Sequence, residues 1–124
     1  MRDPGRNLVT VDRFVVRPSG PLSGTVRVSG MTKNAGLKQM AAALLAPGVT
    51  TLRNLPPVSD LQVMIDVLRA IGARVEWVEP DVLEIDASAD LVPEAPYELV
   101  SQMRASINVL GPLVARCGEA RVAM

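Results

Sequence analysis

The chain has 124 residues, with 13 basic and 13 acidic side chains, no histidine, one cysteine and 2% aromatic residues. Without histidine it can form neither a Ser-His-Asp nor a Cys-His relay, and one cysteine excludes both a disulfide framework and a four-cysteine zinc site. A formal net charge of zero gives no electrostatic reason to expect nucleic acid or an anionic membrane as a partner, and the length suits one domain.

The first part of the chain is predicted to form a tail and two strands. Residues 1–12 are polar and show no hydrophobic period, which favours a flexible tail. Residues 13–17 and 23–28 each read as a short strand, and the proline- and glycine-containing segment between them indicates a turn.

The hydrophobic period then becomes that of helices. A helix is predicted over residues 33–46, ended by a Pro-Gly pair, and a strand over residues 49–55. A second helix follows from Ser59, the expected N-cap, and Gly72 ends it. One face of that helix carries its apolar side chains, Leu61, Met64, Ile65, Leu68 and Ile71.

Strands over residues 74–78 and 82–86, joined by a tight turn, predict an antiparallel hairpin. After a proline-rich linker, a third helix is predicted over residues 97–116, with a kink near Gly111 because Pro112 removes one backbone hydrogen bond.

A last strand over residues 119–124 completes the pattern. Strands that alternate with helices predict a mixed α/β fold with βαβ crossovers and a helix-backed sheet. Because this strand has no cap or turn after it, we expect the sequence to be part of a longer chain. No apolar run approaches the roughly 20 residues that a membrane span requires, so a cytoplasmic protein with no membrane partner is predicted.

The turn before the first helix is a candidate anion site. Lys33 and Asn34 begin a helix after a glycine-bearing turn, where free N–H groups and the helix dipole attract negative charge. A lysine there opposes the dipole, so helix stability does not explain its presence. The alternative is a solvated Lys33, with Thr32 or Asn34 as the helix cap.

Two residues of the predicted third helix, Arg104 and Cys117, also have a functional and a structural interpretation. Arg104 borders the apolar stripe and suits bidentate contact with phosphate or carboxylate, although a surface ion pair with Glu98 or another acid is the alternative. Cys117 is expected to be structural, because it lies at a helix end and nothing in the sequence can activate it. The aspartates show no metal-loop spacing, so no metal is expected.

Three segments together resemble the amino-terminal part of the enolpyruvyl transferases, from about residue 14 to 124: VSGMTKNAGLKQMAAALLAPG, NLPPVSDLQVMIDVLRAIGARVE and APYELVSQMRASINVLGPLVARCGEARV. The sugar-nucleotide branch is favoured over the shikimate-pathway branch. Shikimate enzymes typically carry Ser-Lys-Ser where this chain has Thr-Lys-Asn, and they lack the MRAS helix.

The resemblance implies transfer of the enolpyruvyl group of phosphoenolpyruvate to the 3-hydroxyl of UDP-N-acetylglucosamine, with no metal or organic cofactor. This is the first committed step of peptidoglycan synthesis. Lys33 and Asn34 match the family's Lys-Asn pair at the substrate site, where the lysine contacts phosphoenolpyruvate. Arg104 matches the substrate-binding arginine of MRAS.

The resemblance also implies a fold of two similar domains, each an inside-out α/β barrel of βαβαββ units with the substrates in the cleft between them. Residues 13–32 would then pack in the second domain, and residues 33–124 would form an incomplete first domain. The chain departs from the family at Asn108, where many members have tryptophan, and the Met31-Thr32 stretch is often one residue shorter.

No catalytic residue is expected in this chain. The family's catalytic cysteine or aspartate follows in a P-G-G loop just after the last strand, so the 124 residues are expected to be inactive alone and to need the remainder of a parent chain. The alternatives are a noncatalytic binding or interaction module and the shikimate-pathway transferase.

Overall fold

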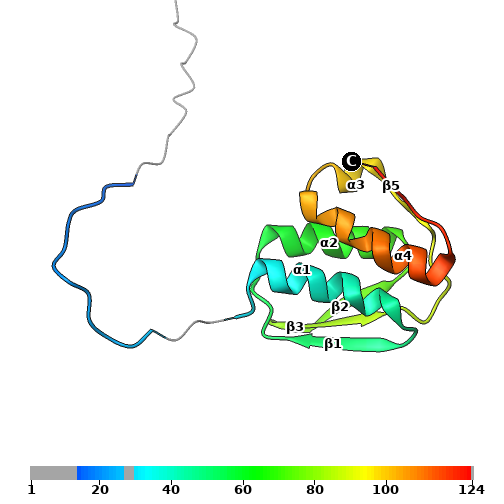
Figure 1. Cartoon of the computed structure of the whole chain (residues 1–124). Coiled ribbons are helices and arrows are strands. Elements are labelled where there is room, and N and C mark those ends of the chain that lie inside the picture. The colour runs from blue at the N-terminus through cyan, green and yellow to red at the C-terminus, as the bar shows by residue number, and fades with distance from the viewer. Residues whose placement is uncertain (1–13, 27–29, 124) are drawn as a thin grey trace, which may run out of the picture.

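The structure is a computed structural model and describes residues 14–26 and 30–123. Its helices and strands all lie within residues 30–123 (Figure 1). In chain order they are α1 (Lys33–Ala42), the 3-10 turn η1 (Ala43–Leu45), β1 (Val49–Arg53), α2 (Ser59–Ala70), β2 (Arg74–Glu79), β3 (Val82–Asp86), β4 (Glu94–Ala95), α3 (Tyr97–Val100), the 3-10 segment η2 (Arg104–Val109), α4 (Leu110–Cys117) and β5 (Arg121–Val122).

The main sheet has three strands in the order β1-β3-β2, and β3 is antiparallel to both neighbours. The predicted hairpin is therefore confirmed. Strands β1 and β2 run parallel to each other, with α2 as their crossover and β3 inserted between them. A second parallel pair, β4 with β5, is connected by α3, η2 and α4. The mixed α/β class predicted from the order of elements is confirmed.

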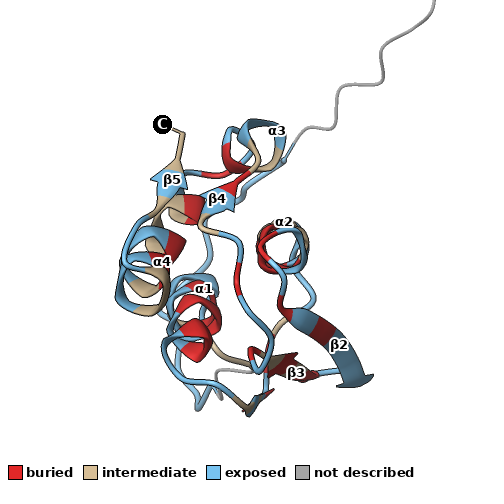
Figure 2. Ribbon diagram, turned by 90° about the vertical axis from the view of Figure 1, so that its right-hand side faces the viewer, coloured by how far each residue is buried: buried red, intermediate tan, exposed pale blue. Residues whose placement is uncertain are grey.

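One face of the main sheet is apolar and the other is polar. Leu52 faces Leu83 across β1 and β3, and Val75 faces Ile85 across β2 and β3; all of these side chains are buried. Helices α1 and α2 cover this face, and α4 lies on the side of α1 that is turned away from the sheet, where it packs against η1 and η2 (Figures 1 and 2). The other face carries Glu76 opposite Glu84, so it suits contact with water.

Helix α1 lies between the sheet and α4, and its local sequence fits that place. The Thr32 hydroxyl accepts a hydrogen bond from the Ala35 N–H at 3.2 Å, which caps the first turn. Gly36 faces the loop after β1: a Cβ at this position would lie 3.0 Å from Leu55 Cδ2 and 3.3 Å from Leu61 Cδ2. A residue without a side chain is therefore what allows α1 to approach the start of α2.

The prediction of one helix over residues 97–116 is wrong. Helix α3 ends at Val100, and Met103 is extended (φ −152°, ψ 123°) with its side chain buried before η2 and α4 begin. Helical spacing of apolar residues cannot separate one long helix from shorter ones that bury the same side chains. Pro112 causes no kink within a long helix, because it lies in the first turn of α4, where its missing N–H has no intrahelical acceptor.

The strands predicted over residues 13–17 and 23–28 are absent from residues 14–26, which form no regular structure and extend away from the packed body (Figure 1). Phe14 is 97% exposed and Val16 is 90% exposed. Alternation alone does not make a strand, because backbone groups need a neighbouring strand to pair with. Residues 1–13 and 27–29, including the predicted tail, lie outside the described residues.

Two predicted element ends are also corrected. Ser59 is the first residue of α2 rather than its N-cap, because Val58 holds the extended cap position without a side-chain hydrogen bond. The last strand is limited to Arg121–Val122, and part of the predicted linker before α3 forms its partner β4.

We predict opposite effects for two Gly→Ala substitutions in helices. Gly36→Ala pushes a methyl group against the buried Leu55 and Leu61 side chains, and overpacking of this kind costs about 1–3 kcal/mol. Gly111→Ala has open space within 4 Å and gains roughly 0.5–1 kcal/mol from the lower entropy of the unfolded chain. Urea unfolding of both variants measures the difference; a stabilised Gly36→Ala would contradict the close approach.

The pKa of the Asp86 carboxyl is held below its usual value by hydrogen bonds from Ser88 and, to a smaller extent, by the Arg74 guanidinium. A carboxyl group with a lowered pKa stabilises the fold above its unfolded-state pKa and loses that effect as the pH falls below about 4. We therefore expect Asp86→Asn to be less stable than the natural chain at pH 7, and the gap to close towards pH 3. A gap that is independent of pH would refute this.

Candidate functional site

Lys33, the first residue of α1, forms an ion pair with Asp60 in the first turn of α2. The distance from Lys33 Nζ to Asp60 Oδ2 is 2.6 Å. The Lys33 side chain is 52% exposed, whereas that of Asp60 is 33% exposed. Asp60 is therefore the more enclosed partner, and the Lys33 side chain is about half exposed.

Backbone contacts hold the starts of α1 and α2 together. The Met31 N–H donates to the Asn54 carbonyl at 2.6 Å, and the Leu55 N–H donates to the Asp81 carbonyl at 3.0 Å. Asn54 takes a left-handed conformation (φ 63°), which asparagine tolerates better than most residues. The loop between β1 and α2 is thus fixed to the segment before α1 on one side and to the β2–β3 turn on the other.

The junction of the two helix starts carries a net positive charge. Each helix N-terminus is equivalent to about half a positive charge, and α1 has no acidic residue in its first turn. The Lys33 ammonium and the Asp60 carboxylate cancel formally, so the two dipoles leave an excess of roughly one positive charge. Such a junction would attract an anionic group, and the anion site expected from the sequence stays a prediction.

Asn34 is the second residue of α1, and its side chain is exposed. The alternative in which Asn34 caps the helix is wrong, because the Thr32 hydroxyl makes the cap. Asn34 therefore stands beside Lys33 at the same helix start.

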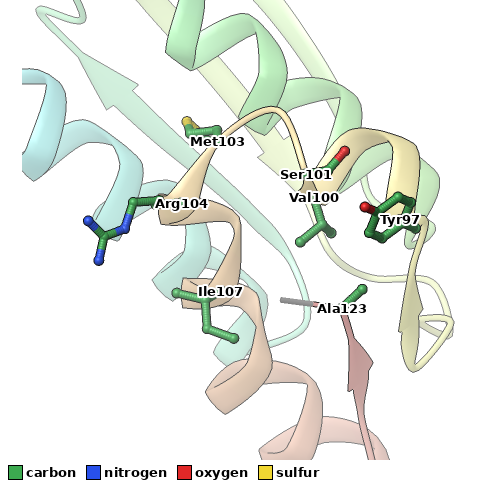
Figure 3. A pocket seen from close by; sticks show the side chains of 7 residues that line it. All are labelled: Tyr97, Val100, Ser101, Met103, Arg104, Ile107 and Ala123. Carbon is green, nitrogen blue, oxygen red and sulfur yellow. The ribbon is translucent and has the colours of Figure 1, made fainter.

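Arg104 is the first residue of η2 and is exposed; within residues 14–26 and 30–123 it forms no ion pair with Glu98 or any other acid. It lines a pocket of about 380 Å³ whose other lining residues are Tyr97, Val100, Ser101, Met103, Ile107 and Ala123. Figure 3 shows the Arg104 guanidinium directed away from Tyr97 and Ala123, on the side where the ribbon of α1 lies.

The structure brings Lys33 together with Asp60 and places Arg104 on a neighbouring element. Segment η2 packs against α1 and begins at the same end of the body as α1 and α2 (Figure 1). Lys33 and Asn34 do not line the pocket beside Arg104. The three predicted residues thus share one end of the molecule but do not line one cavity.

Asp60 was not identified from the sequence as the partner of Lys33. The sequence did contain a signal for the pair. Lys33 stands at a helix start, where the dipole disfavours positive charge, and Asp60 stands at another helix start, where the dipole favours negative charge. Ser106, in the MRAS segment, was also missed: its hydroxyl is fully buried and has no hydrogen-bond partner among the described residues.

Cys117 ends α4, and its thiol contacts the Leu91 carbonyl at 3.6 Å. In the part of the chain that the structure describes, no three acidic or cysteine side chains gather as a metal site, and no helix is long and apolar enough to cross a membrane.

Relatives of known name match almost the whole chain. A UDP-N-acetylglucosamine 1-carboxyvinyltransferase from Myxococcus xanthus is 47% identical over 116 residues, which cover 92% of this chain and 27% of that protein. The enzyme of the same name from Thermotoga maritima is 49% identical over 112 residues, covering 90% of this chain and 26% of that protein. The chain thus spans about a quarter of the length of these curated relatives.

A solved structure agrees with the sequence comparison. The enolpyruvyl transferase NikO from Streptomyces tendae superposes with a TM-score of 0.66 at 35% identity, covering 78% of this chain and 22% of that one. Residues 16–124 match the family model described as EPSP synthase (3-phosphoshikimate 1-carboxyvinyltransferase). The chain therefore belongs to the EPSP synthase family of enolpyruvyl transferases.

Proposed function

We propose that the chain is the amino-terminal portion of a transferase that moves the enolpyruvyl group of phosphoenolpyruvate to the 3-hydroxyl of UDP-N-acetylglucosamine. The observation that carries the proposal is the exposed Lys33 ammonium at a net positive junction of two helix starts, in a chain whose relatives bear the name of this activity. Phosphoenolpyruvate carries a phosphate and a carboxylate, so it is the kind of ligand that such a junction attracts.

The reaction places specific demands on the groups around the reacting atoms. The sugar hydroxyl loses its proton as its oxygen bonds to C2 of phosphoenolpyruvate, and C3 takes up a proton, so the double bond becomes single. C3 then loses a proton, the C2–C3 double bond re-forms, and the bond from C2 to the phosphate oxygen breaks, releasing inorganic phosphate. In this proposal Lys33 holds an anionic group of phosphoenolpyruvate, Asn34 donates to a neighbouring substrate oxygen, and Arg104 binds a phosphate or carboxylate through its planar fork.

The wider assignment follows from the same proposal. Residues 13–32 would pack in a second domain, as the exposed apolar side chains of Phe14, Val16 and Leu22 support, and residues 33–124 would belong to the first domain, an inside-out α/β barrel. The parent enzyme would act in the cytoplasm, in peptidoglycan synthesis, and so serve cell-wall formation, cell shape and division. Neither a metal nor an organic cofactor is part of this chemistry.

A chimera tests the activity. Residues 1–124 replace the matching amino-terminal segment of the Thermotoga maritima relative, and phosphate release is measured with phosphoenolpyruvate and either UDP-N-acetylglucosamine or shikimate 3-phosphate. We expect turnover with the sugar nucleotide only. Turnover with shikimate 3-phosphate would favour the shikimate-pathway enzyme, and a folded chimera without turnover would favour a noncatalytic module.

The 124-residue chain alone is expected to release no phosphate above background with the same substrates. Its sequence does not include the P-G-G loop in which the family carries its catalytic cysteine or aspartate. Phosphate release by the purified chain, at a rate that scales with its concentration, would refute this expectation.

In the chimera, Lys33→Ala is expected to lower kcat/KM for phosphoenolpyruvate about tenfold or more, because a charge-assisted contact is lost. Lys38→Ala, an exposed lysine of the same helix, is the matched control. Arg104→Ala is expected to be impaired as well, and Arg53→Ala on the exposed side of β1 is its control. Equal kinetics for Lys33→Ala and Lys38→Ala would remove Lys33 from the site.

A further inference from the structure

We infer that Asp60 is a positioning residue, which holds the Lys33 ammonium in place for the anionic substrate. The inference rests on the proposed function, because it takes Lys33 as a substrate contact. The observation that carries it is the 2.6 Å contact between Lys33 Nζ and Asp60 Oδ2, which bridges two helix starts.

The ion pair is not needed to join the two helices. Their starts are already held by the hydrogen bond from Met31 to Asn54 and by the packing of Gly36 against Leu55 and Leu61. An ion pair this exposed also adds little to the stability of the fold. What Asp60 fixes is the position of a long side chain that would otherwise sample many rotamers.

The geometry leaves the ammonium available to a ligand. An ammonium group has three N–H donors, and Asp60 is its one recorded partner among the described residues. The Asp60 side chain is the more enclosed of the two, and the Lys33 side chain keeps 52% of its surface exposed. Asp60 itself is a stable anchor, because a carboxylate in the first turn of α2 is favoured by that helix dipole.

The direction in which Asp60→Asn changes the KM for phosphoenolpyruvate shows whether Asp60 positions Lys33 or only adds negative charge to the junction. If Asp60 only added negative charge, Asp60→Asn would make the junction more positive and lower the KM for phosphoenolpyruvate. If Asp60 positions Lys33, the same substitution raises that KM, by about tenfold where a contact loses its alignment. Asparagine has the same shape as aspartate, so packing at the start of α2 is preserved.

The experiment uses the chimera with Asp60→Asn, Lys33→Ala and the double substitution. We expect Asp60→Asn to raise the KM for phosphoenolpyruvate, and the double variant to be no worse than Lys33→Ala, because Asp60 acts through Lys33. Asp60→Glu should recover part of the loss. Asp66→Asn is the matched control, because it removes another carboxylate of α2, one that contacts Gln62 and Arg69.

Each result decides one point. A lowered KM in Asp60→Asn, or losses from Asp60→Asn and Lys33→Ala that multiply in the double variant, would overturn the positioning role while leaving the proposed function intact. A Lys33→Ala variant with natural kinetics would instead overturn the assigned role of Lys33 and the inference with it.

A second measurement on the 124-residue chain does not depend on turnover. Acetylation of lysines by an amine-reactive reagent is followed by mass spectrometry, with Lys38 as the internal reference. We expect Lys33 to react several times faster in Asp60→Asn than in the natural chain, because the carboxylate no longer shields the nitrogen that the reagent attacks. Equal Lys33 rates in Asp60→Asn and Asp66→Asn would show that Asp60 does not hold the ammonium, and would overturn the inference.

Discussion

The close approach of α1 to the start of α2 is the contact on which the rest of the structure depends. Gly36 provides the space, the bond from Met31 to Asn54 fixes the entry of the chain, and the apolar ends of Leu55 and Leu61 fill the interface. Because α1 is then held between the sheet and α4, a shift at this point moves both layers. The same contact brings two positive helix ends together, so a packing constraint and an electrostatic property have one origin.

The elements that the sequence predicted well are those whose signal is local. Helix α2 and the β2–β3 hairpin follow from apolar spacing and from turn residues such as Gly72 and Pro80, which act over a few positions. The prediction of one helix over residues 97–116 failed because Met103 is extended and buried in a core that it shares with residues of α1 and α2, which are distant in sequence. The strand predictions that fall within residues 14–26 failed because a strand requires a neighbouring strand, which no local pattern can supply.

The sequence could point to single residues of the candidate site, but it could not show which residues lie next to one another in space. A lysine that opposes its own helix dipole is a signal within one helix, so Lys33 could be singled out from the sequence as a candidate, which stays a prediction. Its partner Asp60 comes from another helix, and only the packing of the two starts reveals the pair. Arg104 could be singled out for its chemistry, whereas its place on the segment that packs against α1 required the structure.

The Arg116 side chain joins segments that are far apart in the sequence. Its guanidinium donates to the Leu44 carbonyl at 2.9 Å and to the Ala87 carbonyl at 3.2 Å, across 72 and 29 positions of sequence. The entropy lost on closing a loop rises with its length, so the β2–β3 hairpin is expected to form before these contacts. Docking of α4 on η1 would then come late, and hydrogen exchange in α4 would report a unit that opens before the sheet does.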